Sequence, residues 1–244
     1  MASQRHETGK VVVLLADDDR FMCSLIGNAI RNSPRYEVVF AGTGREAIEC
    51  LFSTQPAIDI ALLDFIMPEG NGLEVARRIR TGGTGAARDL PIAMLTGQRD
   101  HRSVRAAMEL DINAYVVKPV TKEGLFSRLD RARAIPFELK DPEVYKRVVI
   151  PDPFGYDRPK AAPLPLPVPP CAAEPEPSIV RIEKRVSELV PGDILGKSVR
   201  DNASANIVVP AHIQLDRALI ARLSDLADMG MIPSTVFVIH KQGA

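Results

Sequence analysis

A set of polar side chains follows four apolar runs in the first half of the sequence. The runs are "KVVVLLA", "AIDIALL", "PIAML" and "AYVV", which end at residues 16, 63, 95 and 117. The polar residues that follow them are Asp17, Asp18, Asp19, Asp64, Thr96 and Lys118. Clustered carboxylates repel one another unless a cation lies among them. The set therefore predicts a site for a small cation, with hydrogen-bond donors beside it.

The chemistry that we expect of such a site is phosphoryl transfer. Oxygen ligands suit Mg²⁺, which keeps several waters and shares its remaining positions with phosphate. Lys118 and Thr96 are donors for the oxygens of an anion beside the metal. Asp64 is the candidate nucleophile, since it is the central acid and stands alone at the end of its run. Taken singly, the acidic triplet also fits a helix cap, and Lys-Pro fits a turn.

The elements that position these residues alternate between two patterns. Apolar runs typical of strands buried on both faces lie at 10–16, 36–41, 57–63, 91–95 and 114–117, and helical patterns at 20–32, 44–53, 72–81, 100–110 and 121–134. Repeated strand-then-helix units predict an α/β fold, a doubly wound five-stranded parallel sheet with helices on both faces. Ligands of such sheets bind outside the carboxyl ends of the strands, so the polar residues converge there.

Four motifs together carry a resemblance to a known family. "LLADDD", "LLDFIMPEGNG", "MLTG" and "AYVVKP", in this order and spacing, resemble the receiver domain of bacterial two-component response regulators. The resemblance covers about residues 10–135 and implies a flavodoxin-like fold. It implies that Asp64 accepts phosphate from a histidine kinase or a phosphotransfer protein. The other roles that it implies are Mg²⁺ ligands (Asp17, Asp18, Asp64 and the Ile66 backbone carbonyl), phosphoryl-binding groups (Thr96 and Lys118) and switch residues (Thr96 and Tyr115).

Two further positions modify what we expect of the site. Asp19 is assigned to a helix cap rather than to the metal. Ile66, two residues past Asp64, is apolar and cannot position an attacking water, which predicts slow self-dephosphorylation.

The stretch "LDINAYVV" lacks the paired acids that precede the last strand in many DNA-binding regulators, which argues against their shared dimer face.

The composition of the chain excludes several classes of protein. The 244 residues carry 31 basic and 31 acidic side chains, so no net field draws the chain to nucleic acid or anionic lipid. No apolar run approaches the roughly 18 residues that span a bilayer, and the start "MASQRHETGK" lacks the apolar core of a secretory signal. The three cysteines and four histidines are scattered, which predicts neither a disulfide framework nor a zinc or catalytic histidine site. We therefore expect a cytoplasmic protein without membrane insertion.

Composition also divides the chain. We predict a disordered N-terminus at 1–9, a receiver at 10–135, a proline-rich linker at 136–178 and a small α+β domain at 179–244. Twelve of the 20 prolines fall in the linker, including "PLPLPVPP", and proline favours a semi-rigid extended spacer. An SH3-type ligand is the alternative reading of that stretch.

The C-terminal part reads as a small unit of strands and one helix. Strands are expected in "IVRIEKRV", "DILGKSV", "NIVVP" and "TVFVI", and a helix at 215–229. On that helix Leu215, Leu219, Leu223 and Leu226 form one stripe, with Arg217, Asp225 and Asp228 largely off it. About 65 residues bury only a marginal core, so the unit is expected to lean on a partner or on a second copy in a homodimer.

A weaker resemblance concerns this second unit. It is similar to a small module often found beside HD-GYP phosphodiesterase domains, through Glu188, Leu189, Pro191, Gly192, Pro210 and the run Val236 to Ile239. The resemblance implies a fold rather than an activity. The near-equal basic and acidic content of 179–244 makes a DNA-binding output and a nucleic-acid partner a poor fit.

These observations predict a response regulator that is not an enzyme beyond its own phosphorylation and dephosphorylation. Phosphorylation would switch a contact with an unidentified downstream protein, or the oligomeric state. Two alternatives remain at this point. One is a phosphorylation-controlled transcription regulator with an atypical DNA-binding output domain; the other is a phosphate sink or scaffold.

Overall fold

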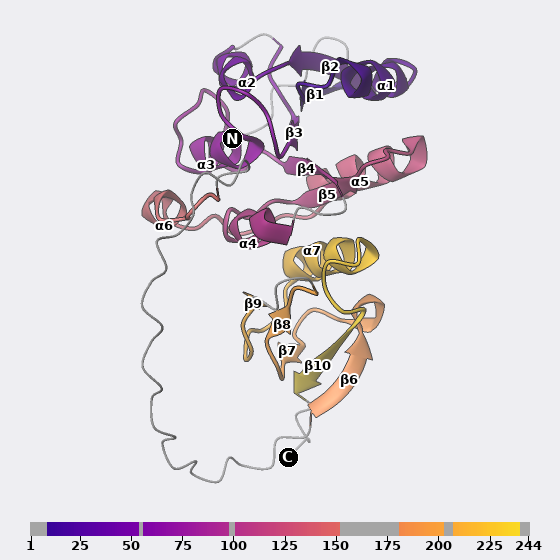
Figure 1. Ribbon diagram of the computed structural model, residues 1–244, viewed down its shortest axis with the longest axis vertical. Helices are drawn as coiled ribbons and strands as arrows, with labels where there is room; N and C mark the ends of the chain where they lie inside the picture. The colour runs from indigo at the N-terminus through magenta and orange to yellow at the C-terminus, as the bar shows by residue number, and fades with distance from the viewer. Residues whose placement is uncertain (1–8, 54–55, 98–100, 152–180, 203–206, 240–244) are drawn as a thin grey trace.

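The computed structural model describes residues 9–53, 56–97, 101–151, 181–202 and 207–239, without the side chains of residues 101–103. Strands and helices alternate through the first half of the chain (Figure 1). They are β1 (Val11–Ala16), α1 (Arg20–Arg31), β2 (Tyr36–Ala41), α2 (Gly44–Phe52), β3 (Ile60–Asp64), α3 (Gly72–Arg80), β4 (Ile92–Thr96), α4 (His101–Glu109), β5 (Ala114–Val117) and α5 (Lys122–Ala134). Residues 1–8, at the predicted disordered N-terminus, lie outside the described residues.

The strands form one five-stranded sheet in the order β2-β1-β3-β4-β5, and every pair in it is parallel. Successive side chains of a strand point to opposite faces, so each face needs its own helical cover. Val13 and Leu15 share a core with α1 and α5, whereas Leu14 and Ala16 share one with α2, α3 and α4. The predicted α/β fold with a doubly wound parallel sheet is confirmed.

The chain beyond α5 packs back on the helices before the proline-rich stretch. Helix α6 (Pro142–Lys146) lies against α3, and the side chain of Tyr145 is fully buried. The ring of Phe137 lies 4.6 Å from the guanidinium carbon of the buried Arg80. The sequence placed the start of an extended linker at residue 136, and residues 136–151 differ from that expectation. Their two aromatic side chains supply packing surface that a count of prolines does not reveal. The run "PLPLPVPP" lies outside the described residues.

The C-terminal part contains two small antiparallel sheets and one long helix. Its elements are β6 (Arg181–Arg185), the 3-10 helix η1 (Val186–Glu188), β7 (Ile194–Leu195), β8 (Val199–Arg200), β9 (Ile207–Val209), α7 (Arg217–Asp228) and β10 (Thr235–Ile239). The sheets have the orders β6-β10-β7 and β8-β9. The stretch "DILGKSV", predicted as one strand, is divided between both sheets. The division follows Gly196, whose amide donates to the carbonyl of Phe237 at 2.7 Å.

Helix α7 is buried on two sides. Asp216 caps its start by accepting from the amide of Leu219 at 2.6 Å. Leu215, Leu223 and Leu226 of the predicted stripe are buried, as expected for a face that packs on its own unit. Asp225, which lies off that stripe, is also fully buried. The reason is visible in Figure 1, where α7 lies between the small sheets and the receiver sheet.

Candidate functional site

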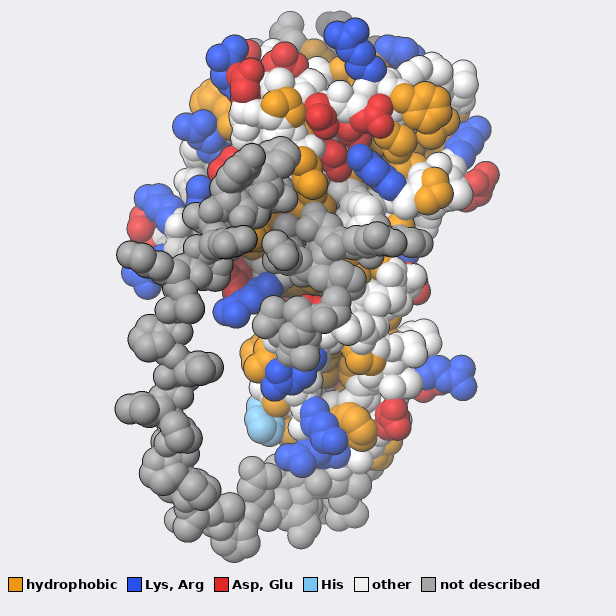
Figure 2. Space-filling model, viewed as in Figure 1, with side chains coloured by type: hydrophobic (Ala, Val, Ile, Leu, Met, Phe, Trp, Pro, Cys, Tyr) orange, Lys and Arg blue, Asp and Glu red, His pale blue; other side chains and the backbone are white. Residues whose placement is uncertain are grey.

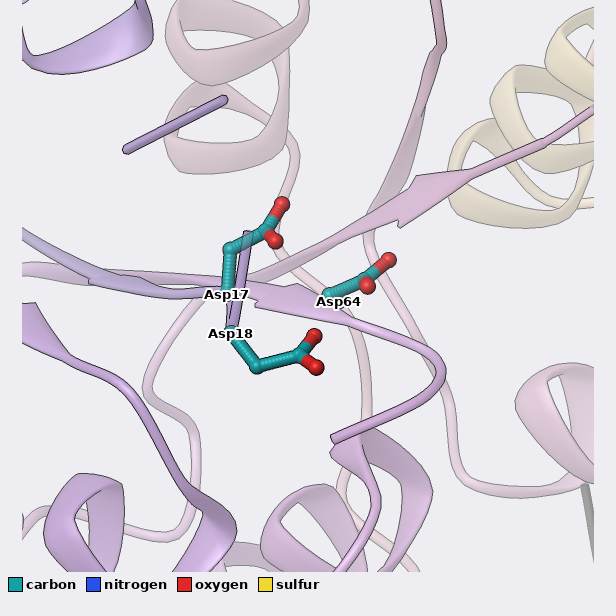
Figure 3. Close-up of side chains that lie close together, drawn as sticks. All are labelled: Asp17, Asp18 and Asp64. Carbon is teal, nitrogen blue, oxygen red and sulfur yellow. The ribbon is translucent and has the colours of Figure 1, made fainter. Parts of the chain in front are cut away.

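Three carboxylates meet at the carboxyl edge of the parallel sheet. Asp17 and Asp18 follow β1, and Asp64 is the last residue of the neighbouring strand β3. One carboxylate oxygen from each lies within 4.8 Å of the others (Figure 3). Asp17 is buried, Asp64 is half-buried and Asp18 is exposed, so the cluster opens to solvent on one side. Figure 2 shows acidic side chains at this edge, bordered by hydrophobic ones.

The turn from β1 into α1 holds Asp17 in place. Oδ1 of Asp17 accepts from the amide of Asp19 at 2.9 Å. Oδ1 of Asp19 in turn accepts from the amides of Phe21 and Met22, which begin α1. The predicted capping role of Asp19 is confirmed, and its carboxylate serves the start of α1 instead of joining the cluster of Asp17, Asp18 and Asp64.

The turn from β3 into α3 requires a glycine beside Asp64. A Cβ built on Gly72 would lie 2.2 Å from the backbone oxygen of Asp64, closer than real side chains come. Asn71 then caps α3, and its side chain and that of Glu74 each accept from the other's backbone amide. The strand end that carries Asp64 is thus fixed by the motif "PEGNG".

Lys118 joins the two less exposed carboxylates. Its Nζ lies 2.9 Å from Oδ2 of Asp17 and 3.1 Å from Oδ1 of Asp64. The side chain of Asp17 is 0% exposed and that of Asp64 is 14% exposed, so both depend on this cation for charge compensation. Burial lowers the pKa of Lys118, but its hydrogen bond to Asp17 and the charge of Asp64 outweigh it, and the net shift is upward.

Asp64 is held in an unusual electrostatic state. Burial raises its pKa from 3.8 to about 6, and the charge of Asp17 adds to that rise while Lys118 opposes it. The carboxylate therefore lacks sufficient compensation in the absence of a further cation. A perturbed pKa of this kind, in a cleft with a named charge partner, is typical of functional sites.

The other predicted site residues lie near this cluster but not all touch it. Thr96 ends β4, and Leu95 before it pairs with Asp64 across the sheet. The hydroxyl of Thr96 donates to the carbonyl of Gly97 at 3.1 Å instead of to a group of the cluster. Ile66 is 41% exposed on the turn after β3.

Tyr115 lies on β5 at the side of the sheet that faces α4. Its side chain is 1% exposed, and its hydroxyl is buried without a hydrogen-bond partner among the described residues. Burial first, and the charge of Asp111 after it, raise its pKa, although Arg222 opposes the shift. Arg222 belongs to α7, so the C-terminal unit covers this residue.

The donor set of the cluster fits a hard divalent cation. Three carboxylates face one ammonium, and the exposed oxygens of Asp18 leave room for water ligands. Among the described residues, these three side chains are the group of possible metal ligands that lie close enough together to share one ion. Asp17, Asp18 and Asp64 could hold the ion together.

Sequence reasoning did not find the residues that attach α7 to the receiver. They include Asp111, Arg128 and Asp225, which make buried ion pairs across that contact. The available signal was a pair of opposite charges, Arg222 and Asp225, one helical turn apart on α7.

Comparisons with known proteins agree with the geometry. The profile of the response regulator receiver domain matches residues 13–130. The chain is 38% identical over 127 residues to the response regulator MprA of Mycolicibacterium vanbaalenii, covering 49% of this chain and 48% of MprA. It is 30% identical over 118 residues to a chemotaxis protein CheY homolog of Campylobacter jejuni, covering 48% of this chain and 88% of that protein.

The chain is also similar to solved structures. The chemotaxis response regulator CheY4 of Vibrio cholerae is 27% identical, with a TM-score of 0.44, covering 50% of this chain and 98% of CheY4. The chain spans about half the length of MprA and of the transcriptional regulatory protein CitT of Halalkalibacterium halodurans.

Proposed function

The chain belongs to the response regulator receiver family of two-component signalling, and we propose that Asp64 is its phosphoacceptor. The phosphoryl group would come from a histidine kinase or a phosphotransfer protein, the partners with which receivers of this family work. Mg²⁺ is the proposed cofactor. The protein would act in a signalling relay, with no enzyme activity beyond its own phosphorylation and dephosphorylation.

One observation carries this proposal: a half-buried carboxylate shares a single ammonium with a fully buried one. The Nζ of Lys118 contacts both Asp64 and Asp17, and Asp18 adds a third carboxylate within 4.8 Å. The excess of negative charge over the one ammonium is unfavourable by itself. It becomes favourable when a divalent cation and a phosphoryl group are present, because the cation offsets the carboxylates and the ammonium can bind the phosphoryl oxygens.

The reaction follows from the placement of these groups. An oxygen of Asp64 attacks phosphorus, the bond from phosphorus to the donor's imidazole nitrogen breaks, and the imidazole leaves and takes up a proton. Lys118 donates to the phosphoryl oxygens as their charge is transferred, and Thr96 does so after its hydroxyl turns away from Gly97. Asp17 keeps Lys118 at the site throughout.

Four groups of this chain would hold the metal: the carboxylates of Asp17, Asp18 and Asp64 and the backbone carbonyl of Ile66. Mg²⁺ in such a position offsets the negative charge of the acceptor and of the incoming phosphate. The exposed side chain of Ile66 stands beside the site as an apolar group. We therefore propose a long-lived phosphoryl group, since no polar side chain at that position orients a water.

The output that we propose is a change of protein contact or of oligomeric state. A DNA-binding output is less favoured, since Arg222 at the centre of α7 is 5% exposed and pairs with Asp111. Salt-dependent binding to generic duplex DNA would favour it. A phosphate sink would be favoured if the C-terminal unit behaved identically with and without a phosphoryl mimic.

No helix among the described residues is both long and apolar enough to cross a bilayer. A place in the cytoplasm, where a histidine kinase delivers phosphate, is part of the proposal.

The test uses acetyl phosphate as a small phosphodonor with the full chain. Intact-mass measurement should detect one added phosphoryl group in the presence of Mg²⁺ and none in excess chelator. The variant Asp64→Asn should take up none. Asp19→Asn is the matched control, since asparagine also caps helices and the residue is adjacent to the cluster. Equal phosphorylation of Asp64→Asn and the wild type would overturn the proposal.

A further inference from the structure

A hollow on one side of the receiver lies outside the acceptor site. Helices α2, α3 and α6 follow one another along this side, and α3 contacts both of the others (Figure 1). The hollow between them has a volume of about 540 Å³, which is within the range of pockets that hold small molecules. It is lined by one face of α3, by single residues of α2 and α6, and by the turn that precedes α3.

Helix α3 supplies most of the wall of this hollow. Positions 74, 77, 78 and 81 have the three- and four-residue spacing of one helical face, and all four residues line the hollow. Val75 of α3 and Ile48 of α2 form an apolar floor, since Val75 is fully buried and Ile48 packs against the same core. The hollow therefore combines a polar wall with an apolar floor.

The two acidic side chains of the hollow already have partners in the protein. Oε2 of Glu69 lies 3.4 Å from Nε of Arg45, and Oε2 of Glu74 accepts from the amide of Asn71 at 3.1 Å. Glu74 also lies in the first turn of α3, where the positive end of the helix dipole offsets its charge. The acidic end of the hollow therefore needs no further cation.

The basic end of the hollow is not balanced in the same way. Arg77 donates to the carbonyl of Val148 at 3.4 Å, and neither Arg77 nor Arg78 is paired with a carboxylate among the described residues. Lys146 pairs with Glu143 of its own short helix, and both of these side chains are more than half exposed. Figure 2 shows Lys and Arg side chains on this side of the receiver. This end therefore has two unpaired guanidinium groups beside a loosely held ammonium.

Such an excess of positive charge favours a dianion over a monoanion. Guanidinium groups bind phosphate oxygens through two parallel N–H donors, which gives them both affinity and orientation. A phosphate monoester carries nearly two negative charges at neutral pH, whereas a carboxylate carries one. The hollow is also larger than a free phosphate ion requires, and its floor suits an apolar group attached to the phosphate.

The hollow and the acceptor site lie on either side of one turn. Asp64 ends β3, and Glu69 and Gly70 of the turn that follows line the hollow. The turn packs closely on α2, because a Cβ built on Gly44 would lie 1.9 Å from the backbone oxygen of Gly70. Neither the carboxylate cluster nor Lys118 lines the hollow, so the two sites can be tested separately.

We propose that this hollow binds a small phosphate ester. Its phosphate would be held by Arg77, Arg78 and Lys146, and its organic part would lie over Ile48 and Val75. This binding site goes beyond the proposed acceptor function and does not depend on it, since no group of the acceptor site takes part.

Three probes, added to the full chain in excess chelator, test the proposal. Phenyl phosphate carries a dianion and a ring, inorganic phosphate lacks the ring, and benzoate carries a ring with a single charge. Amide NMR spectra should show shifts at 69–83 and 143–148 with phenyl phosphate, with a Kd of roughly 1 mM or below. Inorganic phosphate and benzoate should bind about fivefold or more weakly, because each lacks part of the contact.

Variants of the basic end identify the groups that hold the phosphate. Arg77→Met and Arg78→Met keep an apolar stem but remove the charge, and each should weaken phenyl phosphate binding about tenfold, as for loss of one hydrogen bond to a charged group. Arg77→Lys keeps the charge without the fork of donors and should have a smaller effect. Arg133→Met, at an exposed arginine of α5, is the matched control and should bind phenyl phosphate as the wild type does.

Three results would overturn the proposal. The first is a set of shifts confined to 17–19, 64–66 and 118, which would place the anion at the carboxyl edge of the sheet. The second is the absence of shifts at 69–83 and 143–148 with every probe. The third is an unchanged affinity in a folded double variant that combines Arg77→Met and Arg78→Met. Phosphorylation by acetyl phosphate enters none of these results, so failure of this site and failure of the acceptor role are distinguishable.

Discussion

Two groups of charged side chains in this protein differ in how their charge is balanced. At the carboxyl edge of the sheet, Asp17, Asp18 and Asp64 share the ammonium of Lys118, which contacts two of them. At the docked face, where α7 packs on β5 and α5 of the receiver, the single carboxylate of Asp225 pairs with the guanidinium groups of Arg128 and Arg131. The first cluster is open on one side to solvent, and the second is closed by packing.

The difference separates a group of carboxylates with an excess of negative charge from a contact whose buried carboxylate is fully paired. Burial, and the charge of Asp17 after it, raise the pKa of Asp64 to about 6 although Lys118 opposes the shift. A buried carboxylate that pairs with two cations fixes one arrangement of the two surfaces that it joins. Removing one of its partners then lowers the stability of the contact. We therefore expect metal and phosphate to bind at the acceptor edge, the strand ends that carry Asp17, Asp18 and Asp64. Substitutions at the docked face should instead change the stability of the contact.

The largest effect should be on the rate of phosphorylation, and it should come from removing the charge of Lys118 at the acceptor edge. Lys118→Met leaves Asp17 buried beside Asp64 without compensation and removes a donor to the phosphoryl group. We expect the rate of phosphorylation by acetyl phosphate to fall by roughly 100-fold or more, as for loss of one transition-state donor. Lys122→Met, on the exposed start of α5, is the control. A rate within twofold of the wild type would contradict the role of Lys118.

A second change adds a polar group beside the acceptor. Ile66→Asn introduces a side chain that can orient water, and the lifetime of the phosphorylated protein should shorten by roughly 10- to 100-fold. The measurement is the decay of the phosphorylated mass after the donor is removed. Ile66→Val keeps the position apolar and should retain the wild-type lifetime. An unchanged lifetime in Ile66→Asn would count against the proposed effect of Ile66.

A third change relieves the charge excess itself. Asp64 has a pKa raised from 3.8 to about 6, so the folded state binds its proton more tightly than the unfolded state does. Its charged form therefore lowers the free energy of unfolding above pH 6, and this cost disappears as the pH falls toward 3.8. Asp64→Asn should raise the free energy of unfolding by about 1–3 kcal/mol at pH 7.5 without metal. Denaturant unfolding at pH 7.5 and at pH 4.5 checks this, since the gain should shrink at the lower pH.

The smallest effect is expected for the free energy of unfolding when a residue of the docked face is replaced. Arg222→Met removes one partner of Asp111, which keeps its contacts with Lys140 and Tyr145. The free energy of unfolding should therefore fall by only about 1–2 kcal/mol, less than for a buried charge left fully unpaired. Arg217→Met, exposed near the start of the same helix, should change it little. A larger loss in Arg217→Met than in Arg222→Met would contradict the assignment of the contact.

The sequence predicted the receiver fold because its signals are local. The apolar runs of β1, β3, β4 and β5 are buried on both faces, whereas the edge strand β2, predicted to be so as well, is largely half-buried. The turns carry glycine, proline or a capping side chain. The grouping of Asp17, Asp18, Asp64 and Lys118 at one edge followed from the parallel order of the strands. Asp19 was correctly separated from them as a cap.

The rest depends on contacts between segments far apart in the sequence. By its position off the leucine stripe of α7, Asp225 is expected to face solvent. Its partners on α5 and the amide of Tyr115 on β5 explain why it is buried instead. Tyr145 stands in a proline-containing stretch, and its burial depends on α3 and Asp111. The division of "DILGKSV" between two sheets likewise depends on the pairing of β7 with β10, which periodicity does not encode.

The most direct test of the account is to identify the residue that carries phosphate. Borohydride reduces an aspartyl phosphate to homoserine, which peptide mapping by mass spectrometry locates. After treatment with acetyl phosphate and Mg²⁺, we expect homoserine at position 64 and none at the closed contacts of Asp111 and Asp225. Homoserine at another carboxylate, or at none while phosphate is incorporated, would contradict it.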